Sequence, residues 1–240
     1  VVELGFISPV EIKKIREIAA LSKVMLDPVD SNNYATFYSA SPGKKWEVRS
    51  KMLEWLGKLK VPTITGIMVG IGETKVTRKA ALEYIAHMHR EYGMIHEVLI
   101  QNFVPQTNTP MKKNKTTTPK QMLDAFELAR TILPDDIMVT IPIDHNDNLD
   151  DFIKSGLRDF GRIYEGRPII KAAQRTEEEL SELADRHGLT LQQRFPLRRD
   201  FIKEGHYSKK LGQVFDNYRY KIKKEEQEKI KELKQGVHGS

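Results

Sequence analysis

Two glycines that flank an isoleucine at the end of an apolar run are the strongest local signal for binding chemistry in the sequence. The segment Gly66-Ile-Met-Val-Gly-Ile-Gly-Glu73 carries Gly70, Ile71 and Gly72 directly after the run. Because glycine permits positive φ and exposes backbone N–H and C=O groups, such a loop could cradle a phosphate or follow the edge of an adenine. A tight turn into a helix, with Glu73 near the positive helix start, explains the same residues equally well.

Two amide side chains close another apolar run. Gln101 and Asn102 stand at the end of a strand-like segment, where apolar residues would cost less to bury. Amides both donate and accept hydrogen bonds, so the pair indicates recognition of the polar edge of a substrate.

The segment Asp144-His145-Asn146-Asp147 contains residue types that bind metal ions. Adjacent residues on an extended chain point to opposite sides, so they rarely converge on one ion, and no H-x-H or H-E-x-x-H pattern supports a histidine site. Asp147 is more simply the N-cap of a following helix.

One arginine stands in the first turns of an expected helix. Arg49 suits a bidentate grip on a carboxylate. The alternative is an exposed charge paired with Glu47 or Glu54.

Helices must position these groups, and several helix starts can be identified from the sequence. Capping boxes, two of them with proline at the first helical position, begin at Ser8, Thr118 and Thr176. The helix after Thr176 is expected to stop before Gly188. Apolar periodicity predicts further helices over 46–60, over 76–92 ending at Gly93, and from Asp147 to near Gly156.

Short apolar runs alternate with these helices. They cover residues 24–26, 63–69, 97–101 and 137–141, and they are nearly continuous in apolar character, as in strands buried on both faces. Regular alternation predicts βαβ units, a parallel sheet and right-handed crossovers. The first helix stands where the pattern expects a strand. The polar residues described above, with Asp27, follow the carboxyl ends of the strands, where α/β folds gather their chemistry.

Composition excludes several classes of protein. The 240 residues include no cysteine, which rules out disulfides, thiolate zinc sites, a cysteine nucleophile and cluster ligands from this chain. A mean hydropathy of -0.50 and the lack of a long apolar run argue against a membrane span, and no signal peptide is visible, so we expect a cytoplasmic protein. The chain begins with Val1, so we expect a piece of something longer.

The net charge of +6 is concentrated near the carboxyl end. Residues 206–235 hold nine Lys and Arg residues against five Asp and Glu residues, and acids and bases alternate at helical i,i+4 spacing. This pattern is typical of a solvated helix and does not favour nucleic-acid binding.

The order and spacing of four segments resemble the radical S-adenosylmethionine enzymes, and most closely the first subunit of the FO synthase family, which makes the deazaflavin chromophore. The segments are Pro62–Thr74, Tyr92–Phe103, Thr109–Met111 and Ile132–Ile137. The resemblance implies an α/β fold, a partial (β/α) TIM-type barrel of parallel strands with a C-terminal charged helix. Residues 1–205 would be the C-terminal part of that barrel and residues 206–240 a charged helical tail.

The resemblance also implies roles for individual residues. The binding residues for S-adenosylmethionine would be Asp27 at the ribose, Arg49 at the methionyl carboxylate, and Gly66, Gly70, Ile71, Gly72 and Glu73 along the adenine. Gln101, Asn102 and His145 would line the substrate side.

The family carries a 4Fe-4S cluster on a C-x3-C-x2-C motif that this chain lacks, so we expect no metal ligands here and an inert chain unless the cysteine-bearing part is present. Other departures, at 142–145, at 159–162 and in the unmatched loop 163–174, lie on the substrate side. By resemblance the expected partners are a small-molecule substrate and FO synthase subunit 2. An exposed edge of the incomplete barrel could also allow self-association. The charge pattern and the hydropathy predict neither nucleic acid nor membrane as a partner.

Two alternatives stay open. The first is a non-catalytic, cluster-free barrel descendant that serves as a binding or scaffold subunit. The second is a cluster-free barrel enzyme that binds the phosphate of a small molecule at Gly70 to Thr74.

Overall fold

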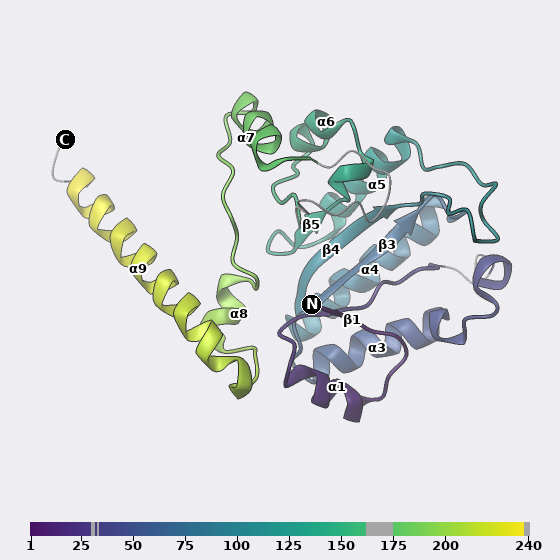
Figure 1. Ribbon diagram of the computed structural model, residues 1–240, viewed down its shortest axis with the longest axis horizontal. Helices are drawn as coiled ribbons and strands as arrows, with labels where there is room; N and C mark the ends of the chain where they lie inside the picture. Colours follow the sequence, from purple (N-terminus) through teal and green to yellow (C-terminus); the bar gives the residue numbers. More distant parts are fainter. Residues whose placement is uncertain (30–31, 33, 162–174, 238–240) are drawn as a thin grey trace.

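Five parallel strands form one sheet in the computed structural model, which describes residues 1–29, 32, 34–161 and 175–237. The strands β1 (Val2–Glu3), β2 (Ser22–Lys23), β3 (Thr63–Val69), β4 (Ile95–Asn102) and β5 (Met138–Thr140) lie in chain order across the sheet (Figure 1). All four neighbouring pairs are parallel, which confirms the predicted α/β class. The unmatched loop 163–174 lies outside the described residues.

Two strand predictions need correction. The chain does not start with a helix, because β1 precedes the first helix and pairs with β2. The second strand lies at Ser22–Lys23 rather than at 24–26. The backbone nevertheless keeps its hydrogen bonds to β3 beyond Lys23, since Val24 N donates to Ile64 O at 2.9 Å and Leu26 N to Gly66 O at 2.8 Å. The apolar run 24–26 therefore identified a buried segment of the chain but not the residues at which β2 begins and ends.

Among the described residues, four helices connect successive strands and cover one face of the sheet (Figure 1): α1 (Pro9–Arg16), α3 (Trp46–Lys58), α4 (Lys75–Tyr92) and α5 (Pro119–Ile132). After β5 follow α6 (Leu149–Lys154), α7 (Glu177–Arg186), α8 (Arg199–Glu204) and α9 (Gly212–Val237). Short 3-10 and π turns occupy Tyr34–Tyr38, Pro42–Lys44, Ile143–His145 and Lys209–Leu211.

The helix ends follow local chemistry. The three predicted capping boxes are all formed, at Ser8, Thr118 and Thr176, and Gly93 caps α4 in the left-handed conformation. A fourth box, Thr74 with Thr77, was missed because threonine rather than Glu or Gln stands at its third position.

The prediction that Asp147 caps the sixth helix is wrong. Asn148 holds the N-cap position of α6 and makes no side-chain cap bond. Asp147 instead extends into solvent and pairs with Arg175 at 3.6 Å.

The main core lies between the sheet and the helices on its outer face. Alternate residues of β3, β4 and β5 point toward α4 and α5, and the core is built from Ile67, Val69, Val98, Ile100 and Val139 against Leu82, Ile85, Ala125 and Phe126. The same alternation leaves the other residues of these strands on the opposite, inner face.

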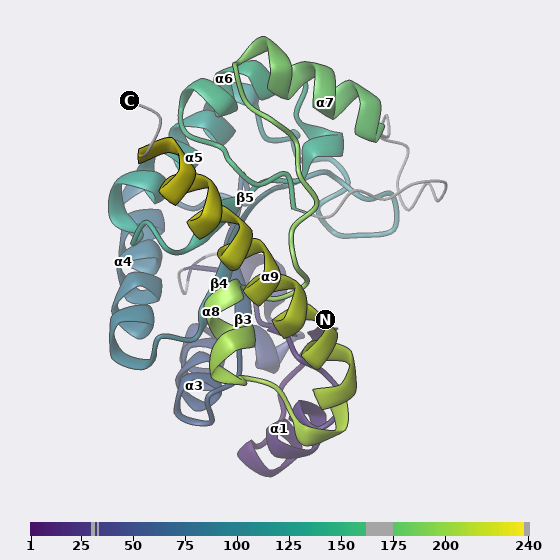
Figure 2. The same cartoon turned by 90° about the vertical axis from the view of Figure 1, so that its left-hand side faces the viewer.

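A strap and a long helix cover part of that inner face. We call residues 189–198, which run from α7 to α8, the strap; it passes in front of the strands in Figure 2, on the side away from α3 and α4. A second core joins Leu21 and Ile64 to Phe201, Phe215 and Ile222. The predicted charged helix is thus α9, and it contributes Phe215 and Ile222 to this second core. Within the described ranges, no helix combines the length and apolar character needed to cross a membrane.

Candidate functional site

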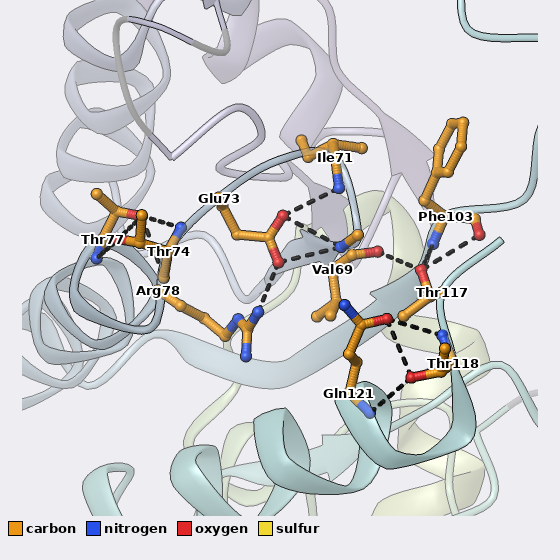
Figure 3. A network of polar contacts seen from close by, with 11 residues as sticks. Val69, Ile71, Glu73, Thr74, Thr77, Arg78, Phe103, Thr117, Thr118 and Gln121 are labelled. Atoms are coloured by element: carbon orange, nitrogen blue, oxygen red, sulfur yellow. Dashed lines mark hydrogen bonds and ion pairs between the residues drawn. The ribbon is translucent and has the colours of Figure 1, made fainter. Parts of the chain in front are cut away.

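The glycine loop after β3 is held by a buried carboxylate. Glu73 accepts hydrogen bonds from Gly70 N at 3.0 and 3.1 Å and from Ile71 N at 3.0 Å, and it pairs with Arg78 at 2.7 Å (Figure 3). The Glu73 side chain is 1% exposed. The loop is therefore a braced turn into α4, and the N–H groups of Gly70 and Ile71 are already used, which argues against a phosphate cradle.

Thr117 joins this loop to the end of β4. Its hydroxyl donates to Val69 O at 2.6 Å and accepts from Phe103 N at 2.9 Å (Figure 3). Gly70 has φ +95°, and a Cβ at this position would lie 2.2 Å from the Thr117 hydroxyl. The glycine is required here both by its backbone conformation and by the close approach of Thr117.

Gly66 serves a different contact. A Cβ at Gly66 would lie 2.0 Å from the backbone oxygen of Leu99 on β4, which is far inside van der Waals contact. Glycine in a strand interior marks such a close backbone approach. The inner surface of β3 is therefore bare backbone at this point.

Asp27 directly follows the first apolar run, 24–26, after the last backbone hydrogen bond from that segment to β3. It is 2% exposed, and its Oδ2 accepts from Lys44 Nζ at 2.8 Å, whereas its Oδ1 has no hydrogen-bond partner in the described part of the chain. Burial and the Asp27 charge raise the pKa of Tyr38 to about 12. An unpartnered buried carboxylate oxygen is costly, and it can accept a hydroxyl or N–H of a ligand.

Arg49 is buried rather than exposed, so its predicted alternative pairing with Glu47 or Glu54 is wrong. Its NH1 donates to Leu4 O at 2.9 Å, and its Nε has no partner among the described residues. Burial lowers the pKa of Arg49, and the charges of Asp27 and Glu3 partly offset this effect. Glu54 is engaged by Lys51 and Lys58 instead.

The three residues predicted to contact substrate line a single cavity. Gln101, Asn102 and His145 all border a space of about 2100 Å³ between the inner face of the sheet, the strap and the loops beyond β4 and β5. Asn102 Oδ1 is buried without a partner in the described chain. Among the described residues, none of the seven predicted to bind the cofactor lines this space. Met68, which stands between Gly66 and Gly70, does line it.

Sequence reasoning missed a group of charged residues deeper in the cavity. Glu97 on β4 pairs with Arg194 of the strap at 2.8 Å, and Arg194 also pairs with Asp159 at 3.0 Å. Burial raises the pKa of Glu97, and Arg194 partly opposes that rise. A glutamate inside an otherwise apolar strand was the available signal, but its partner is distant in sequence.

His96, beside Glu97, is held uncharged. Its Nε2 lies 3.2 Å from Arg194 NH1, and its Nδ1 accepts from Arg198 N at 3.4 Å. Burial, together with the Arg194 and Arg198 charges, lowers the pKa of His96 to about 3.

No cluster of three or more potential metal ligands occurs in the part of the chain that the structure describes. In the Asp144–Asp147 segment, Asp144 Oδ1 accepts from Arg175 N at 3.3 Å, and Asp147 pairs with the same arginine. These two carboxylates are therefore bound to Arg175 rather than to each other.

The sequence was compared with known proteins. No family model matches the chain. Curated relatives named 7,8-didemethyl-8-hydroxy-5-deazariboflavin synthase are 37% identical over 217 residues in Archaeoglobus fulgidus, 38% over 183 residues in Methanococcoides burtonii and 33% over 221 residues in Methanopyrus kandleri. These alignments cover 89%, 75% and 88% of this chain but only 66%, 54% and 65% of the relatives. The chain thus spans just over half to about two thirds of their length.

The fold also matches solved structures. HydG, a maturase of the [FeFe]-hydrogenase, aligns with a TM-score of 0.65 at 11% identity over 90% of this chain and 48% of its own. HydG from Carboxydothermus hydrogenoformans aligns with a TM-score of 0.58 at 12% identity, covering 78% of this chain and 46% of that one. At such low identity these matches show a shared fold and nothing of function.

Proposed function

Because this chain is homologous to the 7,8-didemethyl-8-hydroxy-5-deazariboflavin (FO) synthases over 89% of its length, we propose that it forms the cofactor and substrate walls of a radical S-adenosylmethionine enzyme of that type. The observation that carries the proposal is the 37% identity over 217 residues, an alignment long enough to include most of the sheet and its loops. The partial barrel is the expected scaffold, with its polar groups at the carboxyl ends of the strands.

Several groups fit the cofactor. The unpartnered Oδ1 of Asp27 is available for a ribose hydroxyl, and the unpartnered Nε of Arg49 for a carboxylate oxygen. Gly66 contributes indirectly, because the absence of a side chain allows β3 to lie close to Leu99 of β4. Glu73 acts through the loop, because its carboxylate fixes the Gly70 and Ile71 N–H groups in place. S-adenosylmethionine, if bound here, would supply a hydrogen-abstracting 5′-deoxyadenosyl radical when the family's reduced 4Fe-4S cluster donates one electron and methionine leaves.

The 4Fe-4S cluster does not fit this chain. Cluster iron is held by cysteine thiolates, and the 240 residues include none. We therefore propose that the cluster ligands lie outside these residues and that this chain by itself is inactive. The role of this chain is to bind and orient the reacting groups and to exclude water from them.

On the substrate side, the proposal places a tyrosine-derived adduct of 5-amino-6-ribitylaminouracil in the cavity. Gln101 lines this space together with Asn102, whose Oδ1 has no partner among the described residues, and with His145. Amide and imidazole groups suit the ribityl hydroxyls and the ring edges of such a molecule. FO synthase subunit 2 would supply the adduct, and both would act in the cytoplasm.

A binding experiment tests the cofactor wall. Isothermal titration of the 240-residue chain with S-adenosylmethionine should give measurable affinity, and Asp27→Asn should weaken it at least tenfold. Asp147→Asn, which changes an exposed carboxylate, is the matched control and should leave affinity unchanged. No binding by the wild-type chain would contradict the proposal.

An activity experiment tests the missing cluster. The chain should be combined anaerobically with a cysteine-bearing segment from one of the curated relatives, iron, sulfide and subunit 2. FO formation, followed by its fluorescence, should require the added segment. Binding of S-adenosylmethionine without any reconstituted activity would favour the non-catalytic scaffold instead.

A further inference from the structure

Three charged side chains from distant parts of the chain meet on the inner face of the sheet. Glu97 Oε2 lies 2.8 Å from Arg194 NH2, and Arg194 Nε lies 3.0 Å from Asp159 Oδ2. The remaining nitrogen, Arg194 NH1, contacts His96 Nε2 at 3.2 Å. Each nitrogen of the guanidinium therefore has one partner, which fixes the orientation of Arg194 in this cluster, and two of its five N–H groups remain unused.

Glu97 still has capacity. Its Oε1 accepts from Thr140 Oγ1 at 2.9 Å, and its Oε2 accepts from Arg194. Since a carboxylate has about four acceptor positions, roughly two remain for a donor in the cavity. The Glu97 side chain is 9% exposed and lines that cavity.

The charges around Glu97 do not cancel. Two carboxylates, Glu97 and Asp159, share one guanidinium, and His96 is uncharged at neutral pH because its pKa lies at about 3. Arg198 pairs with Asp200 and with Asp136. Arg158, which also lines the cavity, donates to the backbone oxygens of Ile153 and Leu157. The cluster of Glu97, Arg194 and Asp159 therefore holds one more negative than positive charge, which favours N–H donors and amines at Glu97 and disfavours anions there.

The cavity wall is polar at both ends and apolar between them. Glu97, Leu99 and Gln101 alternate onto the same face of β4, and at ~3.3 Å per residue Glu97 lies ~13 Å from Gln101. Leu99, Met68 and Met138 line the space between. A ligand that fills it is elongated, with an apolar or aromatic middle.

We propose that Glu97 is a specificity-determining residue of this cavity and binds the end of an elongated substrate that is rich in N–H donors. Arg194 is the positioning residue that fixes the Glu97 carboxylate. The inference rests on the proposed function and adds to it a residue and an orientation: the donor-bearing ring points to the deep end and the hydroxylated end toward Gln101.

The test uses the 240-residue chain and needs no cluster. Anaerobic isothermal titration with 5-amino-6-ribitylaminouracil as the donor-rich probe should show binding, and Glu97→Gln should weaken it at least tenfold. Orotate, an anionic uracil, is the second probe. The wild-type chain should reject it and Glu97→Gln should bind it more tightly, whereas a merely structural role would weaken both probes alike.

Two further variants keep the test decisive. Arg194→Lys retains a charge but loses the three-way contact, so it should weaken probe binding at least threefold with an unchanged affinity for S-adenosylmethionine. Glu83→Gln, on the exposed face of α4, is the matched control and should change nothing. Glu97→Gln should likewise leave the affinity for S-adenosylmethionine unchanged, which shows that the variant is folded.

The outcomes separate the two proposals. If S-adenosylmethionine binds but the wild-type chain ignores the uracil probe, or if a folded Glu97→Gln variant binds it within twofold of wild type, the inference about Glu97 is overturned. If the wild-type chain does not bind S-adenosylmethionine, the proposed function itself fails.

Discussion

The hydroxyl of Thr117 lies 2.6 Å from the carbonyl oxygen of Val69, and this contact joins the entry of α5 to the carboxyl end of β3. Phe103 N, at the end of β4, donates both to the same hydroxyl and to Val69 O, each at 2.9 Å. One buried hydroxyl therefore fixes the relative positions of two strand ends and of the glycine loop between them. The geometry of the proposed cofactor wall depends on this contact.

Thr117→Val should destabilise the chain by about 0.5–1.5 kcal/mol, because it keeps the shape of the side chain but removes one of the two hydrogen bonds made by Val69 O and one of the two made by Phe103 N. Urea unfolding followed by circular dichroism measures the loss. Thr116→Val, one residue earlier and exposed, is the control. Equal stability of the two variants would show that the contact contributes nothing.

Gly66→Ala should be among the most damaging single substitutions in the sheet. The added methyl group would lie 2.0 Å from Leu99 O, so β3 and β4 must separate, at a cost of more than about 3 kcal/mol. Gly5→Ala, where no atom lies within 4 Å of the new Cβ, should change stability by less than about 0.5 kcal/mol. A Gly66→Ala protein that unfolds at the wild-type temperature would refute the close approach.

Glu73→Gln should loosen the glycine loop. The amide replaces one acceptor oxygen by an NH2 donor that faces the N–H groups of the loop and Arg78. Breaking the buried ion pair between Glu73 and Arg78 costs about 3 kcal/mol. We also expect weaker binding of S-adenosylmethionine, because Gly70 and Ile71 lose their fixed positions. Unfolding and titration should be compared with Glu83→Gln, whose Lys79 pair is exposed. Loss of stability with an unchanged affinity for S-adenosylmethionine would show that Glu73 stabilises the loop but does not contribute to binding.

His96 should make the chain sensitive to acid. Its pKa falls from 6.5 to about 3 on folding, so the unfolded chain takes up a proton first as the pH drops, and stability is lost between pH 6.5 and 3. The loss amounts to about 4 kcal/mol over that window. His96→Gln keeps an acceptor for the arginines but does not titrate.

The measurement for His96 is the slope of unfolding free energy against pH. His96→Gln should show a shallower slope between pH 6.5 and 3 than wild type, whereas His87→Gln, at an exposed site, should not. Parallel slopes for wild type and His96→Gln would contradict the prediction, because they would mean that the His96 ring takes up its proton as readily in the folded as in the unfolded chain.

Local signals in the sequence predicted the scaffold well. Capping boxes at Ser8, Thr118 and Thr176 depend on contacts three residues apart, so the sequence contains all of their determinants. The apolar run at 63–69 coincides with β3 because both faces of that strand are buried. Asp147 does not cap α6, because the helix begins one residue later than predicted, with Asn148 at the N-cap.

The site was predicted less completely. Gln101, Asn102 and His145 do line one cavity, which follows from their positions after parallel strands. Arg194 could not be predicted, because it lies 97 residues from Glu97 in a segment without helical or strand periodicity. Arg49 was placed correctly on its helix, but its burial against Leu4 O depends on tertiary packing.

The strand order has a consequence for how the chain is made. Because each strand pairs with the one synthesised just before it, the sheet can assemble stepwise as the chain leaves the ribosome. The strap and α9 break this rule, since Arg194 and Phe215 return to residues of β4 and of the segment around Leu21 that were made much earlier. We expect the inner face to stay open to chaperones until the strap and α9 have been synthesised, because these segments form the far wall of the cavity.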